Sequence, residues 1–307
     1  MKTPLLAAIA LSGPWLMLLP LLGATGRETS PATQPAAVAP PAAEGVLEIL
    51  GKDARPLVEG VEGGEIDWTR GEVRAIGVGK MEGRGGADFA MAQRAARLAA
   101  ARNAVLLMAG IPAGPGTRFS TVERGRITVD AIVRDFRETA SDYDPKTATV
   151  TSTIAIPLYG ASGVVRLIGV VPDKPAKRWN WPENKGGSPP EWVVLDARGS
   201  KFQPCMFPQV ATEAGEVIFH ASDFSGDDPA RGPALYAQAA PKAEPVIKDA
   251  LVIKVKSPGD KDASTLVLDK AALDALSARP SARETMKAGK TVIITGASPP
   301  AAGDEMK

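Results

Sequence analysis

One strong helix-forming segment, placed directly after a glycine-rich stretch, constrains this chain more than any other feature. Residues 88–110 (DFAMAQRAARLAAARNAVLLMAG) are almost all good helix formers, with Asp88 near the start and Gly110 at the end. The preceding EIDWTRGEVRAIGVG alternates apolar residues on both sides of a turn at 69–71, a pattern typical of a β-hairpin. The sequence therefore predicts a strand pair covered by one long helix.

The predicted helix has an apolar side that contains one amide. At about 100° per residue, the residues that share this inner face are Phe89, Ala92, Ala96, Ala99, Asn103, Leu106 and Leu107. An unpaired buried amide costs about 1–3 kcal/mol, so we expect Asn103 to hydrogen-bond a neighbouring backbone group. The basic residues Arg94, Arg97 and Arg102 predict a solvated face, with a surface for a protein partner or an acidic glycan as the alternative.

The stretch DWTRGEVRAIGVG, with the later AARLAAARNAVLLMAGI, resembles the N-terminal module of the flagellar assembly protein T family and of related bacterial envelope lipoproteins. The residues that match the family pattern are Trp68, Gly77, Gly79, Ala95, Ala96, Ala99, Arg102 and Asn103. Of these, we expect Trp68, Gly77, Gly79, Arg102 and Asn103 to have structural roles. The resemblance implies an exported, non-enzymatic α+β module of an envelope assembly. A looser resemblance, to the region after this module in longer envelope proteins of the family, extends it to about residue 296. The chain departs from the lipoproteins because Cys205 lies too far from the N-terminus to be acylated.

The two ends of the chain lack the patterns of a folded domain. Residues 1–24 combine Lys2 with an apolar run, which predicts a cleaved secretory signal or, alternatively, a retained N-terminal anchor. Residues 25–64 predict a disordered Pro/Ala-rich tether, and residues 297–307 a disordered tail. We therefore expect an exported protein of the periplasm or cell envelope.

The remainder predicts an α+β fold with two small domains, each an antiparallel sheet with packed helices. The first domain covers 65–170 and includes strands over 126–144 and 146–160 that alternate in polarity. A Pro/Gly-rich linker follows at 171–190. The second domain covers 191–296, with a hairpin around residues 213–215 and a helix capped near Asp269.

The composition provides few of the residues that commonly act as catalysts or metal ligands. The net charge is +1 and the charges are well mixed, so nothing indicates a nucleic-acid partner. His220 and Cys205 are the only histidine and cysteine, which disfavours a zinc site or a Cys-His pair. Gly77-Val78-Gly79 precedes a helix, but no acidic residue follows as a dinucleotide-binding loop requires, so we interpret these as hinge glycines.

Asp196, in the turn Asp196-Ala197-Arg198-Gly199, is expected to accept backbone N–H groups rather than to act as a catalytic carboxylate. The aspartates of SDFSGDDP lack the distal glutamate of a calcium loop and predict a solvated turn. His220 is expected to be a surface or packing residue at the end of a strand, and Cys205 to be a small buried residue.

We therefore predict a non-catalytic interaction or scaffold module without metal or small-molecule cofactor, with envelope proteins as partners. By resemblance, the assembly is flagellar. The alternative is a periplasmic ligand- or glycan-binding protein with a groove between its domains. Trp179 and Trp181, two residues apart in the linker, lie on the same side of an extended segment. We predict that they pin the two domains together, and the alternative is a sugar-stacking platform.

Overall fold

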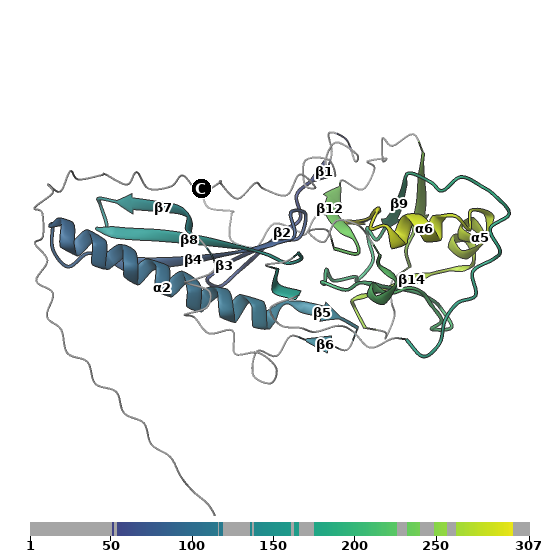
Figure 1. The fold of residues 1–307 in the computed structure, drawn as a ribbon, viewed down its shortest axis with the longest axis horizontal. Coiled ribbons are helices and arrows are strands. Elements are labelled where there is room, and N and C mark those ends of the chain that lie inside the picture. The colour runs from purple at the N-terminus through teal and green to yellow at the C-terminus, as the bar shows by residue number, and fades with distance from the viewer. Residues whose placement is uncertain are drawn as a thin grey trace, which may run out of the picture. The chain divides into compact units, whose positions relative to one another are not determined.

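The chain folds into two modules, each with its own main sheet (Figure 1). The computed structural model describes residues 51, 54–115, 117–118, 136, 138–160, 163–165, 175–225, 232–239, 249–256 and 262–296. All of them belong to one compact unit of the chain, Ala39–Lys307. Mixed sheets with few helices confirm the α+β class and the presence of two domain-like regions.

The first module is a five-stranded antiparallel sheet in the order β2-β3-β4-β8-β7. The strands are β2 (Val58–Val61), β3 (Gly64–Asp67), β4 (Glu72–Lys80), β7 (Glu138–Asp144) and β8 (Thr149–Pro157). The predicted hairpin is confirmed, since β3 and β4 pair in antiparallel register with Ile66 opposite Val73. Residues 126–135 and 137 of the predicted strand lie outside the described residues.

The folded part begins earlier than predicted. Strand β2 lies within the range that we expected to be a tether, and it pairs along its whole length with β3. Before it, the short strand β1 (Ala54–Arg55) joins the second module's sheet next to β12 (Leu235–Ala239). Composition did not reveal these strands because glycines and acidic residues dominate the segment. The predicted signal, the tether up to residue 50 and the tail at 297–307 lie outside the described residues.

A single long helix, α2 (Gly86–Gly110), runs along β4 and β8 (Figure 1). The residues that it buries are Ala92, Ala96, Ala100, Ala101, Ala104, Leu107 and Met108. The predicted inner face was therefore rotated about the helix axis: Leu106 is 69% exposed and Phe89 37% exposed. The helix is apolar on nearly all sides, so periodicity alone could not select the buried side.

Two glycines of β4 decide which side of α2 is buried. A Cβ atom on Gly77 would lie 2.1 Å from the carbonyl oxygen of Ala96, and one on Gly79 would lie 2.0 Å from that of Ala92. Both glycines lie inside the strand, on its buried face. The prediction that they act as a hinge was therefore wrong: their missing side chains let the alanine-rich helix touch the strand backbone.

The second module is built on a five-stranded sheet in the order β1-β12-β15-β9-β13. Its main strands are β9 (Trp192–Asp196), β12, β13 (Ala250–Lys254) and β15 (Thr291–Thr295). We expected an antiparallel sheet, but β12, β15, β9 and β13 all pair in parallel. Continuous burial along β9 and β15 fits this, because parallel strands are normally covered on both faces.

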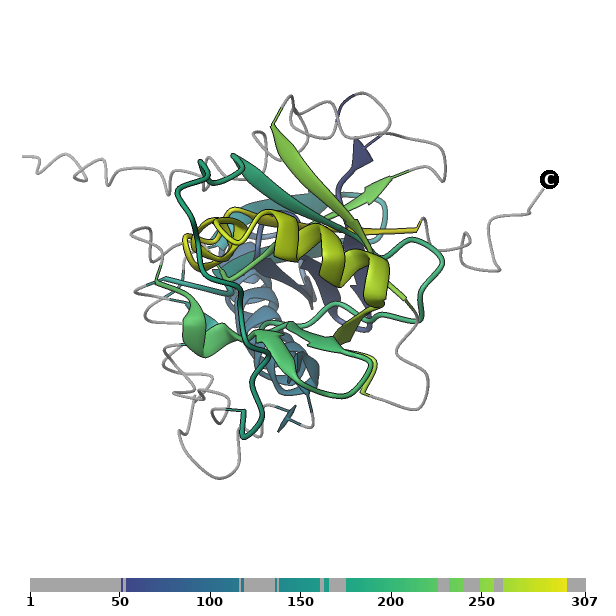
Figure 2. The same ribbon diagram turned by 90° about the vertical axis from the view of Figure 1, so that its right-hand side faces the viewer.

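A three-stranded sheet and two short helices complete the second module. In the sheet, β10 (Gln209–Thr212) lies between β11 (Val217–Phe219) and β14 (Thr265–Leu268). The predicted hairpin is confirmed, with Gly215 at a φ of 83° in its turn. Helix α5 (Lys270–Ala278) begins at the predicted cap, since the Asp269 carboxylate accepts the backbone N–H of Ala272 at 2.9 Å. Figure 2 shows α5 and the following α6 (Ala282–Lys287) across the strands.

The two modules share one hydrophobic core. A single cluster of buried residues includes Trp68 and Ile154 from the first module and Leu195 and Tyr236 from the second. The strand β5 (Pro112–Gly114), which follows α2 and pairs with β6 (Thr117–Arg118), receives backbone hydrogen bonds from Met206 and Phe207 at 2.9 and 2.7 Å. The described residues therefore form one continuous body.

Candidate interaction surface

Trp68 links the hairpin of the first module to the second module. Its side chain is 2% exposed and its ring meets that of Tyr236 edge-on, with centroids 5.6 Å apart. Its indole N–H donates to Glu59 at 3.1 Å, so the polar end of the buried ring is satisfied. Beside it, the Thr69 hydroxyl donates to the carbonyl oxygen of Tyr236 at 2.7 Å. The structural role expected for Trp68 thus includes a contact between modules.

A group of charges covers the same hairpin. Arg74 pairs with Glu65 at 3.0 Å and donates through its Nε to Glu72 at 2.7 Å. Asp67, whose side chain is fully buried, accepts from the backbone N–H and the guanidinium of Arg70 at 2.8 and 3.3 Å. Each charge already has an opposite partner within the hairpin. These ion pairs and hydrogen bonds therefore stabilise the turn between β3 and β4.

Asn103 makes the backbone hydrogen bond that the sequence predicted. Its amide nitrogen donates to the carbonyl oxygen of Ile76 at 2.7 Å. The N–H of the same Ile76 donates to the carbonyl oxygen of Gly63 at 2.8 Å, just beyond the last residue pair of β3 and β4. The side chain is half-buried at the rim of the helix face rather than at its centre. Asn103 therefore satisfies an edge carbonyl of β4 that no longer has a strand opposite it.

The basic residues of α2 differ in their surroundings. Arg94 and Arg102 are exposed, whereas Arg97 is half-buried and donates to the carbonyl oxygen of Phe136 at 3.4 Å. The helix contains one acidic residue, Asp88, whose carboxylate accepts the N–H of Gly85 at 3.0 Å at the helix start. The expected solvated basic face thus exists, with Arg94 and Arg102 on it.

The first module exposes several large apolar side chains. On α2, Met91 and Leu106 are 63% and 69% exposed, and on the outer face of β4 Val78 is 56% exposed. Among the described residues, all of the exposed large hydrophobic side chains except Val252 belong to the first module. Met91 and Leu106 lie on the outer side of α2, whereas Val78 lies on the face of the sheet that is turned away from the helix. The sequence analysis missed the exposure of Leu106 because it assigned this residue to the buried face.

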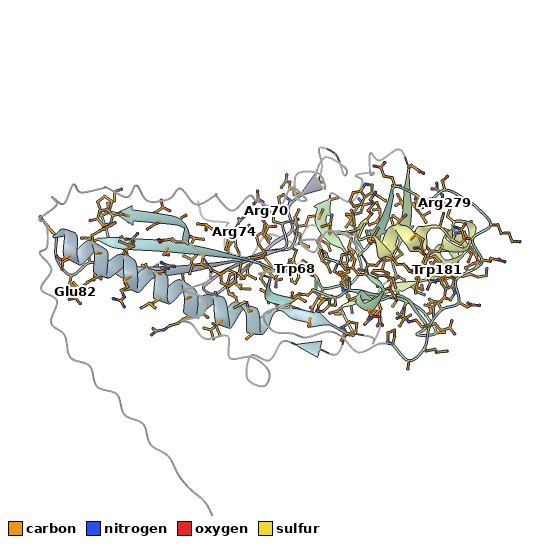
Figure 3. The ribbon with its side chains drawn as sticks, viewed as in Figure 1. Trp68, Arg70, Arg74, Glu82, Trp181 and Arg279 are labelled. Atoms are coloured by element: carbon orange, nitrogen blue, oxygen red, sulfur yellow. The ribbon has the colours of Figure 1, made fainter. Side chains whose placement is uncertain are left out.

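Trp179 and Trp181 contact each other and the second module. Their rings meet edge-on, with centroids 4.9 Å apart and planes 67° apart, so they share one side of the segment as predicted. The backbone N–H of Trp179 donates to Val217 at 3.0 Å, and the indole N–H of Trp181 donates to Ile218 at 3.1 Å (Figure 3). Both partners lie in β11. These hydrogen bonds fasten the linker onto the second module, and both rings pack against the hydrophobic cluster that spans the two modules, so a pinning role for the pair stays a prediction.

Asp196 lies in the local turn that was predicted for it. Its carboxylate accepts the backbone N–H of Arg198 at 3.2 Å and the guanidinium at 2.7 and 2.8 Å. Burial opposes the charged form of Asp196, but the hydrogen bonds and the charge of Arg198 outweigh it and lower the pKa of the carboxyl. A carboxylate held ionised by its own neighbour is a poor general acid.

His220 and Cys205 have structural surroundings. His220 follows β11 and is 3% exposed, and its Nδ1 accepts the backbone N–H of Ser222 at 3.1 Å. Burial lowers the pKa of this imidazole. Cys205 is fully buried, and burial raises the pKa of its thiol to about 12. The Tyr236 hydroxyl donates to the carbonyl oxygen of Cys205 at 2.6 Å, a buried contact within the second module.

The described ranges contain no group of acidic, histidine and cysteine side chains that could hold a metal ion. Nor does any helix within those ranges have both the length and the apolar composition to cross a membrane.

Comparison with known families gives one finding, for the second module. Residues 192–297 match the family model of the second domain of Treponema pallidum Tp0624. The matched range extends from the first residue of β9 to just beyond β15. A comparison with curated proteins found no match.

Proposed function

We propose that the chain is an exported, non-catalytic interaction module of a bacterial cell-envelope assembly, and that its first module contacts other envelope proteins. The observation that carries the proposal is the concentration of exposed apolar side chains on that module. Large contiguous apolar patches commonly mark binding sites, and the two most exposed of these side chains, Leu106 and Met91, both lie on α2. Partners are thus proteins of the envelope, with no nucleic acid and no cofactor.

The polar clusters support a non-catalytic role. Asp196 is paired with Arg198, and His220 uses Nδ1 for a local backbone contact. Of the residues that carry the resemblance to the flagellar assembly protein T module, Trp68, Gly77, Gly79 and Asn103 each have a packing or hydrogen-bonding role. A flagellar basal-body location is the finer proposal, and it rests on that resemblance alone.

Ligand or glycan binding receives less support. A sugar platform needs an open aromatic face, whereas Trp179 and Trp181 meet edge-on and the indole N–H of Trp181 is already bonded to Ile218. Export, with the N-terminal segment either cleaved or retained in the membrane, remains part of the proposal. It rests on the apolar run after Lys2.

Site-specific photo-crosslinking in the source cells tests the proposal. A benzoylphenylalanine replaces Val78, Met91 or Leu106 in the first module, and Val252, which is 44% exposed, is the matched position in the second. We expect adducts with other envelope proteins from at least one first-module position, and none from Val252. If illumination gives no adduct from any first-module position, the proposed function is wrong.

A further inference from the structure

The only histidine of the chain, His220, lies where the linker meets the second module. The residue is 3% exposed and stands between β11 and the short 3₁₀ turn η1 (Ala221–Asp223). Its Nδ1 accepts the backbone N–H of Ser222 at 3.1 Å. Because a backbone N–H can only donate, Nδ1 carries no proton in this arrangement, and the imidazole is neutral with its proton on Nε2.

The turn that His220 holds also binds the linker. Arg178 of the linker donates to the Asp223 carboxylate and, through its other terminal nitrogen, to the Ser222 hydroxyl at 3.3 Å. The Asp223 carboxylate also accepts the backbone N–H of His220 at 3.0 Å, and the Ser222 hydroxyl lies 2.8 Å from Nδ1. Both groups that bind Arg178 are thus positioned by the histidine. We call Arg178, His220, Ser222 and Asp223 the His220 latch.

The linker segment 177–181 lies beside β11 as an added edge strand. The Val217 N–H donates to the carbonyl oxygen of Lys177 at 2.9 Å, and the Trp179 N–H donates to that of Val217 at 3.0 Å. Trp181 adds its indole hydrogen bond to Ile218. A short edge segment opens locally more easily than a core strand. Its attachment therefore depends on these bonds, on the tryptophan rings and on the His220 latch.

A proton on Nδ1 is incompatible with the closed latch. The protonated ring donates from both nitrogens, so the Ser222 N–H would face another donor and lose its acceptor. The imidazolium would also add a positive charge near Arg178. Within the described residues, Arg178 and Asp223 are the charged groups that act on the imidazole. Burial and the charge of Arg178 lower the pKa of His220, and the opposing charge of Asp223 does not outweigh them.

We propose that the His220 latch is a proton-sensitive switch, in which protonation of the imidazole releases the linker segment 177–181 from β11 and deprotonation restores the contact. The direction follows from linkage, because a base held neutral in the closed state regains its ordinary proton affinity when the segment opens. The closed state is most stable above the ordinary histidine pKa of about 6.5. It loses stability as the pH falls from there to the lower pKa of the closed state. The inference does not depend on the proposed function.

Two measurements on the purified protein test the switch between pH 7.5 and 4.5. An NMR titration of the Hε1 signal, unambiguous for a single histidine, gives the pKa of His220, which we expect below 6.5. Hydrogen exchange with mass spectrometry, corrected for the intrinsic pH dependence of exchange, follows peptides that cover 177–181. Their protection should fall toward an acid limit of about tenfold for each unit between 6.5 and the measured pKa. Peptides from β8 should keep their protection.

His220→Asn is the matched variant. The side-chain oxygen of asparagine can accept the Ser222 N–H at this position, but asparagine does not titrate. Protection of 177–181 in this variant should therefore be the same at pH 7.5 and 4.5. Arg178→Gln removes the neighbouring positive charge and should raise the pKa of His220 toward its ordinary value. If His220→Asn does not fold, the agreement between titration and exchange in the wild type still decides the question.

Three outcomes overturn the inference. A pKa of 6.5 or more for His220 would show that the closed latch does not oppose the proton. Unchanged protection of 177–181 while the histidine titrates would show that the proton binds without opening the segment. An equal loss of protection in the wild type and in His220→Asn would assign the acid response to carboxylates instead.

Discussion

At the scale of single residues, polar atoms within apolar surroundings are the informative ones. Asn103 was recognisable from the sequence because an amide on an apolar helix side must find a partner, and Ile76 provides it. Because Asn103 is half-exposed, water can reach the Ile76 carbonyl once the amide is removed. The loss of folding free energy on removing the amide is therefore smaller than for a fully buried one. The fully buried Tyr236 and Cys205 had no such signal, because their contact joins segments that are distant along the chain.

Asn103→Leu should lower the free energy of unfolding by about 0.5–1.5 kcal/mol, the net value of one hydrogen bond. This lies at the low end of the range expected for a fully buried amide. Urea denaturation followed by circular dichroism measures the change. Arg94→Leu, an exposed position on the same helix, is the matched control and should have a smaller effect. Equal stabilities of the Asn103→Leu variant and the wild type would show that the bond to Ile76 contributes nothing.

Cys205 should resist thiol reagents in the folded protein. Because only the thiolate reacts and burial raises the pKa of this thiol to about 12, almost none is ionised at pH 8, and the side chain is inaccessible as well. Incubation with iodoacetamide at pH 8, followed by intact-mass measurement, should show no labelling without denaturant and complete labelling in urea. Complete labelling of the native protein within minutes would contradict the buried position of Cys205.

At the scale of elements, local signals predicted which elements form but not how they meet. The cap at Asp269, the turn at Gly215 and the helix-forming run before Gly110 are local, and each was correctly assigned. The parallel pairing of β9, β13 and β15 was missed, although the continuous apolar runs of β9 and β15 are typical of parallel strands. The buried side of α2 was missed because it is set by glycines in another element.

The contact between α2 and β4 should therefore be sensitive to a single methyl group. Gly77→Ala places a Cβ 2.1 Å from backbone atoms of Ala96 and Ala100, so helix and strand must separate. We expect a loss of about 1–3 kcal/mol in the free energy of unfolding, the usual effect of overpacking. Urea denaturation provides the measurement.

Gly110→Ala is the control for this substitution. No atom lies within 4 Å of a Cβ at that position, and the residue is helical. This variant should be as stable as the wild type or up to about 1 kcal/mol more stable, because alanine restricts the unfolded chain. If Gly77→Ala were equally harmless, the close approach of α2 to β4 would be wrong.

At the scale of the whole molecule, side chains of the first module join it to the second. Trp68, Thr69 and Tyr159 all reach the second module: Trp68 and Thr69 contact Tyr236, and the Tyr159 hydroxyl donates to Met206 at 2.7 Å. The Tyr159 ring also occupies the space where Gly232 lacks a side chain. The family resemblance pointed to Trp68 but not to its partner, because no local pattern connects residues so far apart.

This arrangement predicts that the wild type unfolds in one cooperative transition, since a core that spans both modules must be lost at once. Trp68→Ala with Tyr159→Phe removes an aromatic contact and a buried hydrogen bond between the modules. Truncating a buried tryptophan costs about 3–5 kcal/mol, which is enough to separate the transition into two. Differential scanning calorimetry distinguishes one peak from two.

Trp179→Ala with Trp181→Ala provides the contrasting variant. Because this pair fastens the linker to β11, its removal should speed proteolysis between residues 175 and 190 and lower the stability of the second module. It should not divide the calorimetric transition in the way the Trp68 and Tyr159 substitutions do, because the contacts of those two residues remain. Two well-separated peaks in the wild type would show that the modules are independent. Two peaks in the Trp179 and Trp181 variant alone would show that the linker tryptophans hold the modules together. The contacts at Tyr236 and Met206 would then contribute little to the joint unfolding of the two modules.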